Sequence, residues 1–483
     1  MEQFAVDFVE SSTFTSSSSK DRLGIFNEPF RLHAASAKGL IGQVLRALLE
    51  GAGVDTWDDE HETPLSLAIK HGHVEIARLV IFYGAPVDRD VLSVAIDENG
   101  NTLYPNGDEM VRILLLNLKD QTKVLLEACE KGYQMVHLLL EIGIDAAVRD
   151  ANGFMPLHLA SANGCDQVVQ ILLANGADTS AQTPDGRTPL HLAVENGHRS
   201  VIERLLAAGA NTDTRDEKRR TPLHIAAAKG SVDTVSKLAQ GGADLNAADE
   251  NGQTALHVAA LHNEIGVITW LMERQRVDLG ARDKDQATAL HLAARSRHGE
   301  ATRLLASAGS VMVRAKDKYG QTPLVVASRE DGRESVIRAL VGNGADIAAR
   351  EDSGRSSLEY AACSGHLSVV RLLIENGALL TNKDGFGRMA MHYAAMGSYV
   401  EVVRALADSG AVIDATDKDG WTPLHYAYNT ESHNVVRLLL ERGADPLKKD
   451  RLGRTAQSYE SDKREVNFWT RALPPPYPKT LAP

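Results

Sequence analysis

Cysteine is scarce in this chain of 483 residues. The three cysteines are too few and too widely spaced for a disulfide framework, which favours a reducing compartment. They are Cys129, Cys165 and Cys363. No apolar run reaches the length of a membrane-spanning helix, and the N-terminus carries acidic residues where a signal peptide needs basic ones. We therefore expect an intracellular protein, cytoplasmic or nuclear, without membrane insertion.

Motifs of catalysis and cofactor binding are also missing. The chain has no Gly-Lys dipeptide, which excludes a phosphate-binding P-loop, and no Gly-x-Gly-x-x-Gly, Gly-x-Ser-x-Gly or Cys-x-x-Cys. His61-Glu62 begins like a zinc-protease helix, but the second histidine of that motif is absent. The net charge of -12 argues against direct nucleic-acid binding. These absences predict a non-enzymatic protein with no catalytic residue, no cofactor and no metal.

The chain has an internal repeat instead. The motif Thr-Pro-Leu-His at residues 188–191 recurs at 221–224 and, as Thr-Ala-Leu-His, at 254–257, a step of 33 residues. Further copies upstream and downstream keep a spacing of 33 or 34 residues. A Gly-Ala pair, such as Gly209-Ala210, follows most copies in the same register. Two markers in one register indicate one small unit that is repeated many times.

Each repeat predicts a finger followed by two helices. Thr188 suits a helix N-cap and Pro189 the first helical position, so a short helix begins there. Gly197 lies where that helix must reverse. Apolar residues then recur at helical spacing until Gly209, which suits a left-handed helix end. The polar, turn-rich residues 212–220 that follow predict a protruding hairpin-like finger.

This pattern resembles the ankyrin repeat, whose signature is Thr-Pro-Leu-His-x-Ala with a period of about 33 residues. The resemblance covers residues 28–460 and implies an all-α ankyrin-repeat solenoid of about 13 helix-turn-helix units with β-hairpin-like fingers. Such a stack buries its apolar surface between neighbouring repeats, without one large core. Local departures include an insertion around residues 102–108 and Gln275-Arg276 in place of Gly-Ala.

Histidine is frequent, but its positions follow the repeat. Eight of the seventeen histidines share one position in the repeat, namely His33, His158, His191, His224, His257, His291, His392 and His425. The ankyrin resemblance implies that this imidazole ties neighbouring repeats together by hydrogen bonds. We therefore favour a structural role over metal binding or catalysis.

A column of finger residues is the candidate partner-binding surface, because arginine and aromatic residues dominate it. The predicted contact residues in this column are Phe154, Arg187, Arg220, Arg355, Arg388 and Trp421. Tyr319 and Phe386 add rings two residues earlier on their fingers, and Tyr428 is predicted to make contact from the concave groove. The alternative is that they serve solubility and packing between fingers. A second column places Tyr360, Tyr393 and Tyr426 where other repeats have aliphatic residues. This position favours a core role for the three rings, and the alternative is an aromatic ladder facing a ligand.

Both ends of the chain differ from the repeats. Residues 1–27 are rich in serine and predict a disordered arm. The tail, residues 461–483, is rich in proline. Within it, Pro474, Pro475 and Tyr477 match the Pro-Pro-x-Tyr ligand of WW domains, in which prolines preform an extended helix and tyrosine is the selective anchor. A merely disordered proline-rich tail is the alternative.

The sequence therefore predicts a protein-protein interaction scaffold or adaptor that binds a protein partner on a concave surface of fingers and first helices. The resemblance implies one specific version, a transcription co-regulator that binds a transcription factor. A substrate-receptor or targeting subunit of a ubiquitin ligase or other enzyme, bound through a WW-domain protein, is a second possibility. A membrane-cytoskeleton linker is a third.

Overall fold

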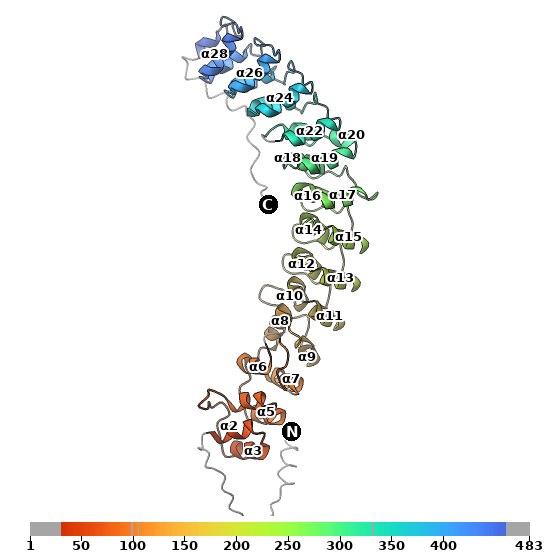
Figure 1. Cartoon of the computed structure of the whole chain (residues 1–483), viewed down its shortest axis with the longest axis vertical. Coiled ribbons are helices and arrows are strands. Elements are labelled where there is room, and N and C mark those ends of the chain that lie inside the picture. Colours follow the sequence, from red (N-terminus) through yellow and green to blue (C-terminus); the bar gives the residue numbers. More distant parts are fainter. Residues whose placement is uncertain (1–29, 98–99, 105, 331–332, 460–483) are drawn as a thin grey trace, which may run out of the picture. The chain divides into compact units, whose positions relative to one another are not determined.

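The computed structural model of this protein describes residues 30–97, 100–104, 106–330 and 333–459. Within them, the helices form thirteen consecutive pairs (Figure 1). They fall into two compact bodies, with the boundary between Asp150 and Ala151. We call these the N-terminal body and the C-terminal body and describe each by itself. The predicted arm and tail lie outside the described residues.

The N-terminal body contains four helix pairs. They are α2 (Arg31–Ala37) with α3 (Ile41–Leu49), α4 (Pro64–Lys70) with α5 (Val74–Phe82), α6 (Arg89–Ala95) with α7 (Gly107–Asn117), and α8 (Gln121–Lys131) with α9 (Val136–Glu141).

The C-terminal body contains nine pairs, one extra short helix and a final 3-10 turn. The pairs are α10 (Pro156–Asn163) with α11 (Asp166–Ala174), α12 (Pro189–Asn196) with α13 (Arg199–Ala207), α14 (Pro222–Ala228) with α15 (Val232–Gln240), α16 (Ala255–His262) with α17 (Ile265–Met272), α18 (Ala289–Arg295) with α19 (Gly299–Ser307), α21 (Pro323–Ala327) with α22 (Glu334–Gly342), α23 (Ser357–Ser364) with α24 (Leu367–Glu375), α25 (Ala390–Met396) with α26 (Val400–Asp408), and α27 (Pro423–Asn429) with α28 (His433–Glu441). The short helix is α20 (Ser310–Val313), and the final turn is η2 (Ala456–Tyr459).

The helix ends follow from local chemistry, as predicted. Thr188 caps α12 by accepting the backbone N–H of His191, and Pro189 occupies the first turn, where its missing N–H is not needed. Gly197 ends α12 at φ 75°, a left-handed conformation that glycine adopts without a Cβ clash. Gly209 takes the same role after α13, at φ 81°.

The core lies between neighbouring repeats. First helices pack side by side with first helices, such as α10 with α12, and second helices with second helices, such as α11 with α13. Leu190 of α12 and Val201, Ile202 and Leu205 of α13 are completely buried. Burial of such a side chain stabilises the fold by about 1.5–3 kcal/mol, so each repeat depends on its neighbours. The predicted all-α repeat solenoid is confirmed.

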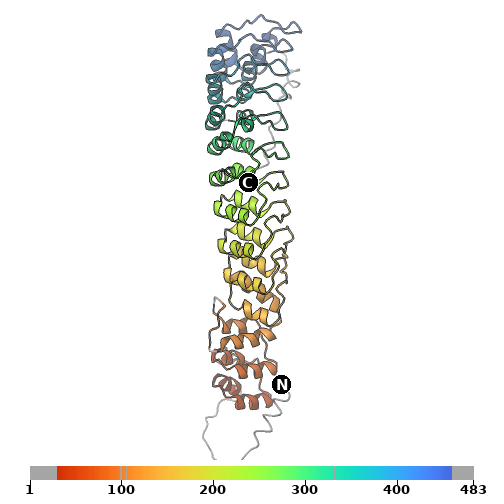
Figure 2. The same ribbon diagram turned by 90° about the vertical axis from the view of Figure 1, so that its right-hand side faces the viewer.

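Fingers connect the repeats of the C-terminal body and project on one side of its helices (Figure 2). Each is a tight turn, as where the Thr183 N–H donates to the carbonyl of Arg187 at 2.9 Å. Backbone hydrogen bonds also join one finger to the next, as from the Glu217 N–H to the carbonyl of Asp185 at 2.9 Å. The fingers therefore form a hydrogen-bonded row beside the helices.

Two consecutive repeats of the N-terminal body lack the predicted finger. Only residues 83–88 connect α5 to α6, and only residues 118–120 connect α7 to α8. The turn sequence Asp97-x-x-Gly100 lies instead between α6 and α7, where Ile96 and Thr102 form an antiparallel bridge. The bridge at residues 96–102 thus lies within a helix pair, and the predicted insertion at residues 102–108 overlaps only its end and the start of α7. A finger before every helix pair was the wrong prediction for these two repeats.

Candidate functional site

The histidine column links neighbouring repeats, as predicted. The backbone N–H of Thr188 donates to Nδ1 of His191 at 3.2 Å, so that nitrogen carries no proton. Nε2–H of His191 therefore donates to the carbonyl of Arg220 on the next finger at 3.2 Å. Burial lowers the pKa of His291 and of His392 to about 4. These imidazoles are neutral at physiological pH and serve the structure.

A second histidine position links four of the described repeats to the preceding one. Nε2 of His198, at the start of α13, bonds to the carbonyl of Ala162 in α10 at 2.9 Å. His73, His298 and His366 make the equivalent bond. In one repeat Arg333 replaces the histidine, and its buried guanidinium donates to the carbonyl of Ala294 at 3.2 Å. Arginine can therefore serve at this position because it also supplies N–H donors.

In one repeat Glu359 stands at the position of His191, and the hydrogen bond to the next repeat then has the opposite donor and acceptor. Its fully buried carboxylate accepts the backbone N–H of Ser356 at 2.8 Å and the side-chain amide of Asn382 at 2.8 Å. Where histidine donates to a carbonyl of the next repeat, Glu359 thus accepts from a side chain of the next repeat. Burial raises the pKa of Glu359 above its ordinary value, although the hydrogen bonds from Ser356 and Asn382 favour the charged form.

An aspartate builds most fingers of the C-terminal body. One oxygen of Asp249 accepts the backbone N–H groups of Asn251 and Gln253, each at 2.8 Å. Asp283, Asp317, Asp384, Asp417 and Asp450 make the same pair of bonds. The 33-residue spacing could have identified this column in the sequence, because five of the six aspartates precede a finger glycine by three residues in an Asp-x-x-Gly turn, and after Asp283 the left-handed position is taken by Gln286. This aspartate column was not among the predicted features.

The last repeats add a tyrosine and an arginine to this aspartate. The Tyr393 hydroxyl donates to Oδ2 of Asp384 at 2.5 Å, and Nε of Arg388 donates to the same oxygen at 3.0 Å. Arg388 also lies over the Tyr393 ring, 4.9 Å from its centroid. Burial and the adjacent Asp384 carboxylate raise the pKa of Tyr393 far above its ordinary value, so the hydroxyl keeps its proton. We call this Tyr-Asp-Arg arrangement the finger clamp.

The finger clamp recurs with small changes. Asp450, Arg454 and Tyr459 form the same arrangement, and Tyr459 continues the tyrosine column one step beyond the three rings noted in the sequence. At Asp417 the arginine is replaced by Trp421, whose ring packs against Tyr426 and Tyr459. Tyr360 is 5% and Tyr393 2% exposed. The predicted core role of the tyrosine column is confirmed for these two buried rings.

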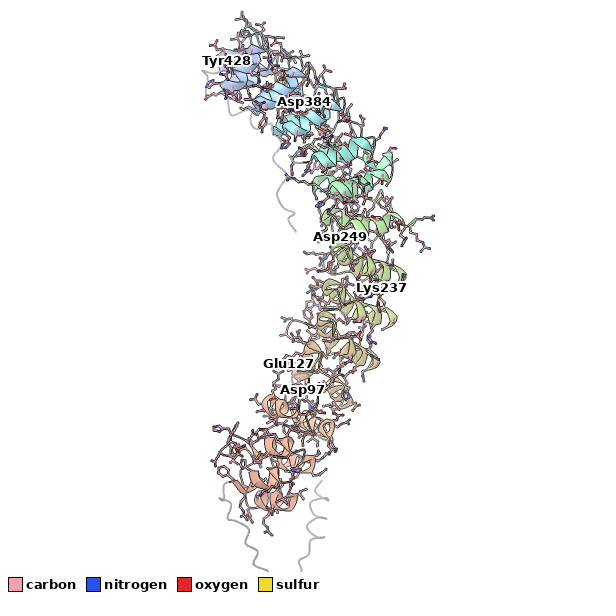
Figure 3. The ribbon with its side chains drawn as sticks, viewed as in Figure 1. Asp97, Glu127, Lys237, Asp249, Asp384 and Tyr428 are labelled. Atoms are coloured by element: carbon pink, nitrogen blue, oxygen red, sulfur yellow. The ribbon has the colours of Figure 1, made fainter. Side chains whose placement is uncertain are left out.

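The predicted contact residues differ in exposure. Tyr319 is 38% and Phe386 56% exposed, each on a fingertip. Five others are half-buried, namely Phe154, Arg187, Arg220, Arg355 and Tyr428. The three arginines among them also form ion pairs within their own repeat: Arg187 with Asp185 and Glu195, Arg220 with Asp216, and Arg355 with Glu351. Asp384 and Tyr428 are marked in Figure 3.

Two predicted contact residues need correction. Arg388 is 8% and Trp421 7% exposed, so neither offers a partner more than a small part of its surface. The finger clamp of its own repeat covers each of these residues. The Tyr459 ring of the next repeat also covers Trp421. Leu452, at the same fingertip position as Tyr319 and Phe386, is 72% exposed and was missed.

Basic finger residues also hold one finger to the next. The Arg215 guanidinium donates to the carbonyl of Ala248 at 2.6 Å, 33 residues later. Equivalent side chains donate to a backbone carbonyl 33 or 34 residues later, Arg282 to that of Lys316, Lys316 to that of Arg350, Arg350 to that of Lys383 and Lys383 to that of Thr416. This ladder uses positive charges for structure, so a basic finger residue is not by itself evidence of a binding surface.

The WW-ligand residues Pro474, Pro475 and Tyr477 lie outside the described residues. Among the residues that are described, no group of three or more His, Cys, Asp or Glu side chains is arranged to hold a metal ion. None of the described helices has both the length and the apolar character to cross a membrane.

Comparison with known proteins agrees with the architecture. A family model described as ankyrin repeats (3 copies) matches residues 32–124, 102–183, 125–216, 190–283, 275–351, 313–384 and 358–450. The chain is also similar to the transient receptor potential cation channel subfamily A member 1 of Drosophila melanogaster, with 28% identity over 146 residues. That match covers 28% of this chain and 12% of the channel. Ankyrin repeats are generally non-enzymatic modules that bind other proteins. Because the family model matches well over half of the chain, the protein belongs to the ankyrin-repeat family and is a protein-interaction scaffold.

Proposed function

We propose that the C-terminal body holds a protein partner along the fingertips of its last repeats. Tyr319, Phe386 and Leu452 are the anchors in this proposal. The observation that carries it is their exposure of 38%, 56% and 72% on fingers that other side chains hold rigidly in place. Large apolar side chains on a rigid frame bury area on binding at low entropic cost.

The spacing of the anchors supports the proposal. The three residues occupy the same finger position in every second repeat, because the fingertips between them carry Ser353 and Asp419. Repeats stack about 8–10 Å apart, so successive anchors lie on the order of 20 Å apart. An exposed cation precedes two of the anchors: Lys318, which also pairs with Asp285, lies before Tyr319, and Arg451 lies before Leu452. The proposed partner therefore presents separated apolar groups with acidic residues beside them.

Substitution of the anchors tests this function. We would replace Tyr319, Phe386 and Leu452 together by serine in the full chain. The control is a triple serine variant at equivalent fingertips, Lys218, Asn251 and Asp419, which are also exposed. Affinity capture with quantitative mass spectrometry should show the main partner lost from the first variant and kept by the second. Equal partner sets for both variants would refute the assignment of these anchors.

The specific role that we propose is co-regulation of a transcription factor, in the cytoplasm or the nucleus. Only the family resemblance supports this version. A transcription factor as the partner that depends on the anchors would support it. A membrane or cytoskeletal protein in that place would favour the linker role instead.

A second candidate function rests on the tail. Pro474, Pro475 and Tyr477 match a WW-domain ligand, which would make the chain an adaptor or targeting subunit for a WW-bearing ubiquitin ligase. Binding of residues 461–483 to isolated WW domains, with and without Tyr477→Ala, tests it. We expect the substitution to weaken binding by about tenfold or more, because tyrosine is the selective anchor. Equally weak binding by both peptides would remove this candidate.

A further inference from the structure

The regular stacking of first helices is interrupted once in the N-terminal body. Within this body α2 packs closely on α4 and α4 on α6, whereas α6 and α8 barely touch. The second helices stay in contact across the same step, α7 with α9, as they do across the step before it, α5 with α7. The first helices have thus separated while the second helices hold the repeats together.

A pocket of about 360 Å³ lies where α6 and α8 separate. One face of each helix lines it, at positions i, i+3, i+4 and i+7. The lining residues are Arg89, Leu92, Ser93 and Ile96 from α6 and its end, Val124, Glu127, Ala128 and Lys131 from α8, and Asp97, Tyr133 and Met135 from the adjoining loops. Asp97 and Glu127 are marked in Figure 3.

Three departures from the repeat coincide at this pocket. No finger precedes α6, no finger precedes α8, and the hairpin that begins at Ile96 lies beside the opening. Fingers would otherwise flank the first helices, as they do in the C-terminal body. The pocket is therefore accessible to an approaching chain segment.

The floor of the pocket is apolar. Leu92, Val124, Ala128 and Met135 are between 1% and 5% exposed, so each belongs to the core of the body and shows only a small part of its surface at the floor. A volume of about 360 Å³ is at the lower end of the range for ligand sites, which suits one or two side chains and excludes a folded element. The floor thus fits an aliphatic or aromatic anchor.

The rim carries two cations, Arg89 and Lys131, and two carboxylates, Asp97 and Glu127. Glu127 pairs with two cations at once, Arg89 and Lys131, the latter at 2.7 Å. The Arg89 and Lys131 side chains are 42% and 51% exposed, so both retain donors that face solvent. Asp97, the other acidic residue of the lining, accepts the backbone N–H and the side-chain amide of Asn101. An incoming carboxylate can therefore pair with the shared cations, while Asp97 is held within its own turn.

We propose that this pocket binds a short linear segment of a partner protein that carries an apolar side chain next to an acidic residue. The apolar side chain enters between α6 and α8 and covers the floor. The acidic residue pairs with Lys131 and Arg89 at the rim. This site is separate from the fingertip anchors of the C-terminal body and does not depend on them.

A displayed library of random peptides, selected against the full chain, tests this site. Selected peptides should share an apolar residue beside Asp or Glu. Their affinity, measured by fluorescence polarisation, should fall about tenfold or more with Ser93→Trp, which fills the opening, and with Lys131→Glu, which repels the carboxylate. Ser93 and Lys131 are exposed, so neither substitution removes a core side chain.

Matched controls lie on α8 outside the pocket. Thr122→Trp and Lys123→Glu make the same chemical changes at exposed positions that do not line it. Both should leave the affinity within about twofold. The proposal fails if no selected peptide depends on both Ser93 and Lys131, or if the control variants weaken binding equally. The fingertip triple variant should bind these peptides normally, so failure here is distinct from failure of the proposed function.

Discussion

Asp384 shows how one side chain can hold three parts of a repeat together. Its Oδ1 accepts two N–H groups of the finger, and its Oδ2 accepts from the Arg388 side chain and the Tyr393 hydroxyl. Every acceptor site that points inward is thus used, as expected for a carboxylate with little access to water. The finger is held against the first helix, which keeps the fingertip in a defined position.

Removal of the Tyr393 hydroxyl should loosen this clamp. We expect Tyr393→Phe to lower the free energy of unfolding by about 1–2 kcal/mol, because a buried hydrogen bond to a charged group is lost. Urea denaturation of the full chain measures it. Tyr428→Phe is the control, because the half-buried Tyr428 takes no part in the clamp, and its effect should stay within about 0.5 kcal/mol. Equal losses for the two variants would contradict the clamp.

The buried histidines make stability depend on pH. The pKa of His291 and of His392 is about 4 in the folded state, against 6.5 when unperturbed. Well above pH 6.5 both histidines are neutral in the folded and in the unfolded chain, so they contribute no pH dependence of stability. As the pH falls toward 5, the unfolded chain binds protons that the folded chain does not, so stability falls by about 2 kcal/mol for each histidine.

Denaturant titrations between pH 7 and pH 5 check this expectation. His392→Gln should reduce the slope of stability against pH, because one buried titrating group is gone. A pH slope that His392→Gln does not alter would show that this imidazole titrates normally in the folded state.

At the scale of one element, a finger depends on its neighbour as well as on its own turn. A Cβ at Gly420 would lie 2.9 Å from the backbone nitrogen of Arg451 on the next finger. A Cβ at Gly443, after α28, would meet no atom within 4 Å. Both glycines have positive φ, 82° and 89°, so they share the same backbone constraint and differ in their surroundings.

This pair of glycines separates backbone strain from contact between fingers. Gly443→Ala should cost about 1–2 kcal/mol, the strain of a left-handed alanine. Gly420→Ala should cost more, because the backbone of the next finger must also move. Thermal unfolding of the two variants provides the comparison. If they lose the same stability, the fingers do not constrain each other.

On the scale of the whole chain, each repeat buries its apolar surface against its immediate neighbours. Contacts run from one pair to the next, such as α12 with α14 and α13 with α15. Stability is then a sum of repeat and interface contributions, so damage to one repeat need not unfold distant ones. Each of the two compact bodies is built by this rule.

Leu190→Ala tests how far a local defect spreads. Leu190 is completely buried, and its truncation should cost about 2–5 kcal/mol. Hydrogen exchange should show lost protection in α12 and its neighbours and unchanged protection in α25 to α28. Leu447→Ala is the control, at a residue that is 76% exposed. A single all-or-none loss of protection along the chain would contradict this picture.

The sequence by itself determined the repeat period, the starts and ends of the helices, and the structural role of the histidine column. The period and the helix ends depend on residues within one repeat, such as Thr188 with His191. The link that each histidine makes to the next repeat was implied by the family resemblance. The same reasoning could have found the finger aspartates, since their spacing is equally regular. It also placed the tyrosine column in the core from the aliphatic residues at equivalent positions.

Only the tertiary structure decided which finger residues are exposed and where the stack opens. Trp421 and Phe386 are both aromatic finger residues in the sequence. Trp421 is buried by a ring of its own repeat and by a ring of the next repeat, whereas Phe386 is 56% exposed. The pocket between α6 and α8 likewise arises because two connections are too short to form fingers and the first helices separate. The exposure of a side chain and the presence of a pocket depend on which side chains the neighbouring repeat places there, and the sequence of one repeat does not contain them.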